Sequence, residues 1–258
     1  MKLILVQPQL RVAPDADNVG VIRTALESAQ LGCERNDIVL LPESFDHGAS
    51  WEVYECEVAA LARRLRCHVV GGSHHQTLPS GTINSGLAFD PDGRIIGRYD
   101  KLRPYASERE YVQPGSVLGE LLIAGRRVLV LVCSDFWFAD LVQRTTRLPD
   151  VILVAALSVS RKPSPEYSRS LWRHLAVARA YEFGVYVGIS DWGYPSDLPL
   201  LCASGVGGFA DPTATTPEML FSPIGNRSVA AHPLDFRALD EFRRDRTSRG
   251  FFWRGVHE

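Results

Sequence analysis

The stretch VLVLVCSDFWFAD, residues 128 to 140, is an apolar run that ends abruptly in polar residues. Its first five residues are all valine or leucine, a composition typical of a strand that is buried in a sheet. Cys133 follows at the end of this predicted strand. It is either one more packing residue or a nucleophile presented at the tip of the strand.

Further runs of the same kind recur along the chain. They are KLILVQ (2–7), DIVLLPE (37–43), CHVVGGS (67–73), DVILVAALS (150–158) and VYVGIS (185–190). Each run is short, rich in β-branched residues and bounded by turn-forming residues, so each predicts a buried strand.

Between these runs lie segments in which apolar residues share one helical face. The three faces comprise Ile22, Ala25, Leu26 and Ala29, with Asn18 as the predicted cap; Trp51, Tyr54, Val58, Leu61 and Leu65; and Leu171, Leu175, Ala178 and Tyr181. Two more segments, 85–99 and 204–220, contain Pro-Asp-Gly and Asp-Pro respectively and predict hairpins.

The predicted elements occur in a similar order twice. Strand, helix, strand and hairpin fill about residues 37 to 100 and again about 128 to 221. We expect the two halves to pair their sheets face to face with helices outside, as a four-layer α-β-β-α sandwich. A doubly wound single sheet is the alternative, which the matching hairpins disfavour. No linker divides the chain, so residues 1–258 are predicted to form one domain.

Composition excludes several classes of protein. The net charge of −2 gives no reason to expect nucleic acid or an anionic membrane as partner. The five cysteines are odd in number and form no CxxC pair, which favours reduced thiols in the cytoplasm. The apolar run at the N-terminus is too short for a signal peptide or a membrane span. We therefore expect a soluble cytoplasmic protein.

Three polar residues follow predicted strands. Glu43 ends the second run, Lys101 follows the first hairpin, and Cys133 ends the run at 128–132. In α/β folds, catalytic groups gather outside the carboxyl ends of strands. A base, a cation and a thiol are what acyl transfer through a thioester requires. Glu43 would take the thiol proton, while Lys101 and the backbone N–H of Ser134 would stabilise the oxyanion.

These segments resemble those of the nitrilase, or carbon–nitrogen hydrolase, superfamily over nearly the whole chain. Pro42-Glu43, the YDK segment with Lys101 and the CSDFWF segment with Cys133 match the family's motifs in order and spacing. The flanking segments REYVQPG and LWRHLAVARAYEFGVYV resemble family segments as well. The resemblance implies a Glu-Lys-Cys triad, the α-β-β-α sandwich and a homodimer. It favours the nucleophile over the packing interpretation of Cys133.

The resemblance also implies a second glutamate after the lysine. Glu108 matches it best by its distance to Pro114-Gly115, and Glu110 is the alternative. Candidates for substrate contacts are the aromatic residues Phe45, Trp137 and Trp192, together with Arg103, which stands where the family usually has histidine. The aromatics are more often core residues, and an exposed structural arginine is the stronger interpretation of Arg103.

The chain departs from the family pattern around the cysteine. Ser134 replaces an aromatic residue and Trp137 replaces an arginine, and the resulting CSD sequence favours amides over nitriles. His74 and His75 are adjacent in a predicted strand and so point to opposite faces, which disfavours a metal site. The GVGGF sequence lacks the Lys-Ser/Thr of a phosphate loop.

The sequence thus predicts a thiol hydrolase that cleaves a small linear amide, or a carbamoyl or ureido compound, to a carboxylic acid and ammonia. It requires no cofactor and no metal. Two alternatives stay open. One is an acyltransferase that passes the acyl group to an amine, and the other is a catalytically silent scaffold of the same fold.

Overall fold

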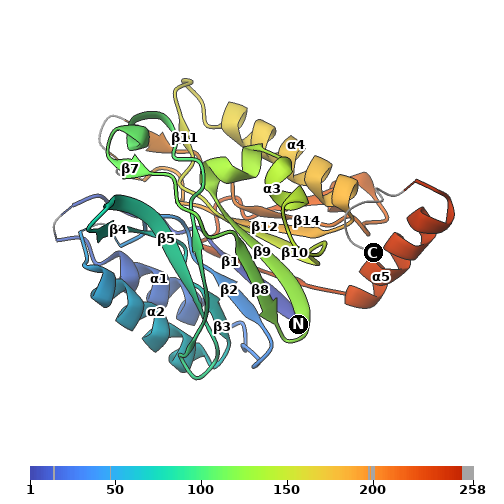
Figure 1. The fold of residues 1–258 in the computed structure, drawn as a ribbon, viewed down its shortest axis with the longest axis horizontal. Helices are drawn as coiled ribbons and strands as arrows, with labels where there is room; N and C mark the ends of the chain where they lie inside the picture. Colours follow the sequence, from blue (N-terminus) through green and yellow to red (C-terminus); the bar gives the residue numbers. More distant parts are fainter. Residues whose placement is uncertain (14, 47, 197, 199–200, 252–258) are drawn as a thin grey trace.

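The computed structural model describes residues 1–13, 15–46, 48–196, 198 and 201–251, and contains two large β-sheets between helical layers (Figure 1). In spatial order, the first sheet comprises β16 (Val229–Pro233), β1 (Lys2–Val6), β2 (Ile38–Leu40), β3 (His68–Val70), β5 (Gly81–Phe89) and β4 (His74–Leu78), with β6 (Ile95–Asp100) and β7 (Val112–Gln113) also paired to β5. The second sheet comprises β15 (Phe221–Pro223), β14 (Gly208–Ala210), β12 (Tyr186–Ser190), β10 (Val151–Ala155), β9 (Arg126–Val132) and β8 (Gly119–Ile123).

The remaining elements connect or cover the sheets. The helices are α1 (Asn18–Ser28), α2 (Trp51–Leu65), α3 (Asp140–Gln143), α4 (Glu166–Phe183) and α5 (Phe236–Ser248), and the 3-10 turns are η1 (Ala106–Glu110), η2 (Cys133–Trp137) and η3 (Pro217–Leu220). Two short strands, β11 (Val159–Ser160) and β13 (Cys202–Ala203), form a separate antiparallel pair.

Both large sheets repeat one pattern of strand directions. In the first, β1, β2 and β3 are parallel, with β16 antiparallel on one side and β5 antiparallel on the other. In the second, β9, β10 and β12 are parallel between the antiparallel strands β8 and β14. The matching halves and the hairpin predicted at 85–99 are confirmed. The second hairpin exists but extends beyond the predicted 204–220, because β14 pairs with β15 at Phe221–Pro223.

Three apolar clusters hold the layers together. The cluster between the sheets includes Leu5 of β1 and Val130 of β9. A second cluster packs α1 and α2 against the outer face of the first sheet, and a third packs α4 against the second. This confirms the predicted four-layer α-β-β-α sandwich. Burial of these clusters supplies the dominant favourable term in folding.

The helices α1, α2 and α4 lie where the sequence predicts them, but two details differ. The N-cap of α1 is Asp17, which accepts from the Gly20 N–H, whereas Asn18 is buried and donates to the carbonyl oxygens of Arg11 and Phe45 at 2.8 Å. The predicted face of α4 is also wrong.

The face of α4 that meets the sheet consists of Trp172, Ala176, Ala180 and Phe183. Tyr181, predicted to be inside, is 47% exposed. Small alanine side chains let a helix approach a sheet closely, so alanines rather than the leucines define the buried side.

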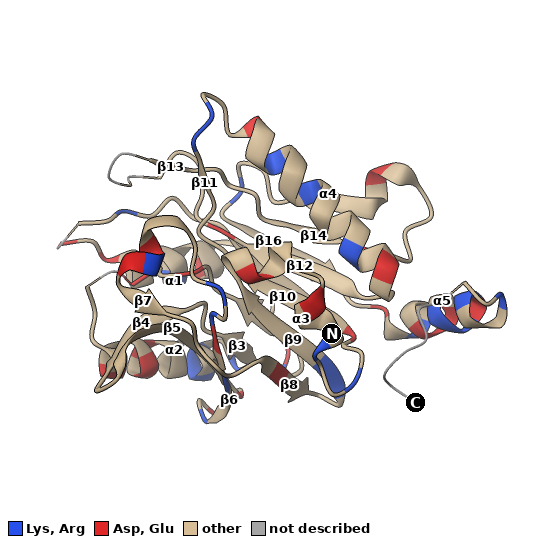
Figure 2. Cartoon of the chain, turned by 45° about the horizontal axis from the view of Figure 1, so that its top comes forward, with Lys and Arg blue, Asp and Glu red and all other residues tan. Residues whose placement is uncertain are grey.

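Most charged residues lie on helices, turns and loops, and the strands are largely free of them (Figure 2). None of the helices within the described ranges is long and apolar enough to cross a membrane.

Candidate active site

The carboxyl ends of strands from both sheets meet at one edge of the sandwich. Glu43 lies just beyond β2 and Lys101 directly beyond β6 in the first sheet, and Cys133 follows β9 in the second. Several hydrogen bonds join the sheets here, among them the following two. The Glu43 N–H donates to the Ala156 carbonyl at 3.2 Å, and the Ser190 hydroxyl donates to the Leu40 carbonyl at 2.8 Å.

The backbone turns sharply at Cys133. Its φ is +46°, in the left-handed region that non-glycine residues rarely adopt, and the chain passes directly from β9 into η2. Such a conformation persists only where the surroundings impose it, and it is common at functional sites. Cys133 as a residue is half-buried, and its Sγ lies 3.8 Å from the Leu157 carbonyl oxygen.

Glu43 is fixed from several directions. The indole Nε1 of Trp192 donates to the Glu43 carbonyl at 2.8 Å, and the Leu157 N–H donates to its Oε2 at 3.0 Å. The same residue, Leu157, therefore contacts both the Glu43 carboxylate and the Cys133 thiol. This contact brings the predicted base and the predicted nucleophile to one point.

Lys101 lies between two carboxylates. Its Nζ is 2.7 Å from Oε1 of Glu43 and 2.5 Å from Oε2 of Glu108, and the residue is 3% exposed. Burial would lower the pKa of Lys101, but the carboxylate charges of Glu43 and Glu108 outweigh it and raise this pKa. The ammonium is thus charged at neutral pH.

Glu108, rather than Glu110, contacts the lysine. It projects from η1, whereas Glu110 at the end of the same turn is exposed. Burial would raise the pKa of Glu108, but hydrogen bonds from His75, Lys101 and Asn84 lower it to about 2. The lysine therefore faces two fixed negative charges.

Asn84 in β5 is a site residue that the sequence analysis missed. It is fully buried, and its Nδ2 donates to Oε1 of both Glu43 and Glu108 at 2.9 Å. An asparagine inside a run of buried strand residues is the sequence signal that could have identified it, because buried polar groups require partners.

The thiol of Cys133 is protonated in the free protein. Burial and the neighbouring Glu43 charge raise its pKa well above the ordinary value, and Lys101 only partly opposes them. A proton must therefore leave the thiol when it attacks. The nearby Glu43 carboxylate is a suitable acceptor.

The other predicted site residues have different surroundings. Ser134 is buried next to Cys133, and its hydroxyl donates to the Arg103 carbonyl at 2.6 Å. Phe45 is 2% exposed and packs in the core near Tyr54. Trp137 is partly exposed and contacts Trp172 edge to face. Trp192 is buried beneath Glu43. The structure thus places Phe45 and Trp192 in the core.

The Arg103 guanidinium binds Asp140 through two hydrogen bonds, at 2.9 and 2.6 Å, and lies over the Phe138 ring. This agrees with the structural interpretation of Arg103.

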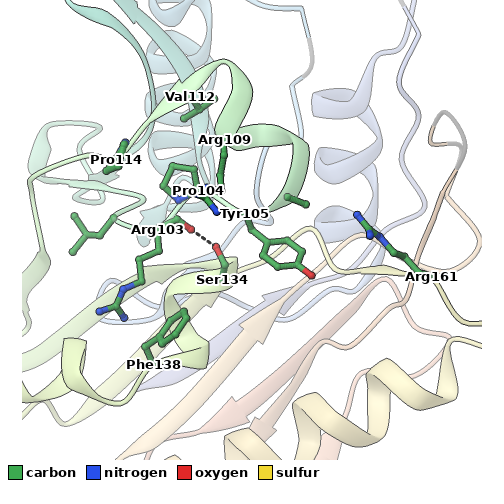
Figure 3. Close-up of a pocket in the computed structure, with 11 residues that line it drawn as sticks. Arg103, Pro104, Tyr105, Arg109, Val112, Pro114, Ser134, Phe138 and Arg161 are labelled. Carbon is green, nitrogen blue, oxygen red and sulfur yellow. Dashed lines mark hydrogen bonds between the residues drawn. The ribbon is translucent and has the colours of Figure 1, made fainter.

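A cleft of about 750 Å³ opens at the segment that follows Lys101 and at Ser134, the neighbour of Cys133 (Figure 3). Ser134 and the segment after Lys101 form part of its wall. Its lining comprises Leu102, Arg103, Pro104, Tyr105, Ala106, Arg109, Val112, Pro114, Ser134, Phe138 and Arg161. The cleft is large enough for a small organic molecule.

The two adjacent histidines have separate partners. His74 lies 2.9 Å from Asp46, whereas His75 lies 3.5 Å from Glu108 and contacts the Tyr111 ring. Within the part of the chain that the structure describes, no three His, Cys, Asp or Glu side chains cluster as a metal site would require.

Known proteins resemble this chain in sequence and in fold. A family model described as carbon–nitrogen hydrolase matches residues 3–199. Over 197 residues the chain is 30% identical to the omega-amidase YafV of Yersinia enterocolitica, an alignment covering 72% of each protein.

Solved structures agree with the fold. Nit3 of Saccharomyces cerevisiae, a member of the nitrilase superfamily, superposes with a TM-score of 0.79 at 20% identity and covers 95% of this chain and 93% of its own. An amidase from Nesterenkonia sp. AN1, in a mutant whose active-site cysteine has added acrylamide, has a TM-score of 0.74 at 21% identity, with 98% and 100% covered.

Proposed function

Because this chain belongs to the carbon–nitrogen hydrolase family, we propose that it hydrolyses a small linear amide to a carboxylic acid and ammonia through a thioester on Cys133. The contact that carries the proposal is the one at Leu157, whose N–H binds Glu43 and whose carbonyl lies by the Cys133 thiol. The omega-amidase relative supports an amide at the end of a carbon chain as the group that is cleaved.

In the first half-reaction, Sγ of Cys133 attacks the amide carbon while Glu43 accepts the thiol proton. The carbonyl oxygen becomes an oxyanion, which the Lys101 ammonium and the backbone N–H of Ser134 stabilise. Collapse of this intermediate breaks the C–N bond. Glu43 returns the proton to the leaving nitrogen, and ammonia departs.

In the second half-reaction, water attacks the thioester carbon and Glu43 accepts its proton. A second oxyanion forms at the same donors and collapses with loss of the Cys133 thiolate, which regains the proton from Glu43. The carboxylic acid leaves. Glu108 and Asn84 act as positioning residues, since they hold Lys101 and Glu43 in place.

We propose further that residues 1–258 form a single domain and that the protein is a cytoplasmic homodimer. Its ligand in this proposal is a small-molecule amide. The reduced-thiol composition supports the compartment, and the family resemblance supports the dimer. Light scattering of the purified protein would test the oligomeric state.

Ammonia release from a panel of aliphatic amides tests the reaction. Wild type should release ammonia, and Cys133→Ala and Glu43→Gln should lower kcat/KM by at least about a thousandfold. The exposed Cys56 provides the matched control, because Cys56→Ala should keep full activity. Turnover that survives in Cys133→Ala would refute the thioester mechanism.

The acyltransferase alternative is tested in the same assay. Hydroxylamine added at increasing concentration competes with water for the thioester and yields a hydroxamate. A hydrolase should still form mainly the carboxylic acid when the amine is present at substrate concentration.

A further inference from the structure

One fully buried carboxylate lies near the triad without belonging to it. Asp191 follows β12 directly. Four donors converge on its carboxylate, namely the N–H groups of Ser158, Val206 and Trp192 and the hydroxyl of Ser158. The Ser158 N–H donates to Oδ1 at 2.9 Å, and the Val206 N–H donates to Oδ2 at 2.8 Å. Such a set of donors fits an ionised carboxylate, because a protonated one would present a donor of its own.

The charge of Asp191 is compensated by these donors. Burial raises the pKa of Asp191 to about 6, although the hydrogen bonds oppose this effect, so the carboxylate is ionised at neutral pH. The donors come from segments far apart in sequence, since Ser158 directly precedes β11 and Val206 lies between β13 and β14. Asp191 thus fixes both segments against the end of β12.

The bond to Ser158 reaches the candidate site through one peptide group. The Ser158 N–H and the Leu157 carbonyl belong to the same planar unit, in which N–H and C=O point in opposite directions. The Leu157 carbonyl oxygen lies 3.8 Å from Sγ of Cys133. By holding the Ser158 N–H, Asp191 therefore directs the Leu157 carbonyl toward the thiol.

The neighbouring peptide group is attached to the proposed base. The Leu157 N–H donates to Oε2 of Glu43 at 3.0 Å. The indole of Trp192, the residue after Asp191, donates to the Glu43 carbonyl at 2.8 Å. A rotation of the peptide group between Leu157 and Ser158 would therefore disturb the proposed base and the proposed nucleophile together.

We propose that Asp191 is a positioning residue for catalysis, whose carboxylate holds the peptide group between Leu157 and Ser158 so that Leu157 keeps Cys133 and Glu43 in place. This inference rests on the proposed amide hydrolysis and adds a residue to it. Asp191 acts through Leu157 rather than on the substrate. Its loss should therefore slow the chemical steps more than it weakens amide binding.

The kinetic test uses Asp191→Asn, which has nearly the same shape. An NH₂ group then replaces one acceptor oxygen, so one of the N–H groups of Ser158 and Val206 faces a donor. We expect kcat for ammonia release to fall by about 100-fold, with KM within about threefold of wild type. Ser158→Ala keeps the N–H bond and loses only the hydroxyl, so its kcat should fall by less than about tenfold.

Asp37 provides the matched control. It is a buried carboxylate that accepts from the N–H groups of Lys2 and Glu34 at 2.6 and 2.9 Å. It directly precedes β2, at the end of that strand opposite to Glu43. Asp37→Asn should lower the urea midpoint, as Asp191→Asn does, but should keep kcat within about twofold. An equal loss of kcat in both variants would assign the effect to stability and overturn the inference.

Alkylation of Cys133 by iodoacetamide is a second readout that needs no substrate. Burial and the charges of Glu43 and Asp191 raise the pKa of the Cys133 thiol, and Lys101 opposes them. In Asp191→Asn one of these charges is gone, so alkylation of Cys133 should begin at a lower pH than in wild type. Asp37→Asn should match wild type.

Two further groups complete the control of this readout. Arg169 of α4 packs on the same network, since it donates to the Ser204 carbonyl at 2.8 Å, and both variants leave it in place. The buried Cys67 should stay slow in both variants, which shows that the fold is intact.

The two readouts separate this inference from the proposed reaction. If wild type cleaves none of the amides, the hydrolase proposal fails, while a shifted alkylation profile in Asp191→Asn still supports the action of Asp191 on the thiol. If wild type cleaves an amide and Asp191→Asn keeps the wild-type kcat, the inference is wrong and the hydrolase proposal stands.

Discussion

The side-chain amide of Asn84 donates to Oε1 of Glu43 at 2.9 Å, across the end of the first sheet. The same nitrogen donates to Oε1 of Glu108, so one NH₂ group uses its two hydrogens on two carboxylates. Lys101 occupies the space between those carboxylates from the other side. Asn84 thereby sets the separation of the two glutamates and the position of the lysine.

Replacing Asn84 should impair catalysis more than folding. In Asn84→Asp, a third carboxylate would face Glu43 and Glu108, so we expect kcat/KM for ammonia release to fall by about 100-fold. The exposed Asn226 offers a matched control, and Asn226→Asp should retain the wild-type rate. Wild-type activity in Asn84→Asp would show that the hydrogen bonds from Asn84 to Glu43 and Glu108 have no role in catalysis.

The thiols should differ in alkylation by iodoacetamide. A hydrogen bond with Cys67 lowers the pKa of Cys33 to about 7, whereas burial raises that of Cys133. At pH 7 without substrate, Cys33 should react faster than Cys133, and the rate at Cys133 should still be rising at pH 9. Peptide mass spectrometry follows each cysteine separately. A plateau for Cys133 near pH 6 would mean that it rests as a thiolate, contrary to this expectation.

Gly72 should tolerate no side chain. It has a φ of +65°, and a methyl group there would overlap the carbonyl oxygen of Pro42, directly before Glu43. Gly32 has a similar φ of +55° but open space around it. We expect Gly32→Ala to lower the free energy of unfolding by about 1 kcal/mol and Gly72→Ala by about 3 kcal/mol or more, as measured by urea denaturation. Equal losses of stability in the two variants would mean that backbone strain alone accounts for the cost and that the overlap with Pro42 adds nothing.

His232 should make the fold sensitive to acid. Burial, with the charge of Arg227, lowers its pKa to about 4, and its ring stacks on Phe209. The unfolded chain takes up this proton near pH 6.5, so the contribution to stability falls as pH drops from about 6.5 to 4, by up to about 3 kcal/mol.

Urea denaturation at pH 7 and pH 4.5 measures this effect. His232→Gln should lose less stability than wild type over that interval. The control variant His174→Gln, at an exposed position on α4, should follow wild type. A His232→Gln variant with the wild-type pH dependence would contradict the assignment.

The sequence predicts the fold well where one residue pattern determines the structure. Short apolar runs such as 128–132 predict buried strands, because a run without polar residues has no side to expose to water. The order of the elements predicts the paired sheets. The helix face of α4 was not predictable from apolar spacing alone. There, Ala176 and Ala180 are buried and Tyr181 is exposed, because close packing depends on side-chain size as well as polarity.

Three residues of the candidate site could be proposed from the sequence, but the residues that hold them in place could not. Glu43, Lys101 and Cys133 could be identified because each follows a strand. Asn84 lies in the middle of β5, where a polar residue in a buried strand indicates that it needs partners, but its partners are 24 and 41 positions away and no local spacing identifies them. The neutralisation of Arg103 by Asp140 likewise depends on a contact over 37 positions.

The hydrogen bonds that join Glu43 to Ala156 and Ser190 to Leu40 cross from one sheet to the other. Glu43 and Lys101 follow strands of one sheet and Cys133 follows a strand of the other, so the distance from the proposed base to the proposed nucleophile depends on the spacing between the two sheets. Side chains such as Leu5 and Val130 fill that spacing. Exchanging core residues of different volume would therefore change the geometry of the proposed reaction without altering any residue of the candidate site.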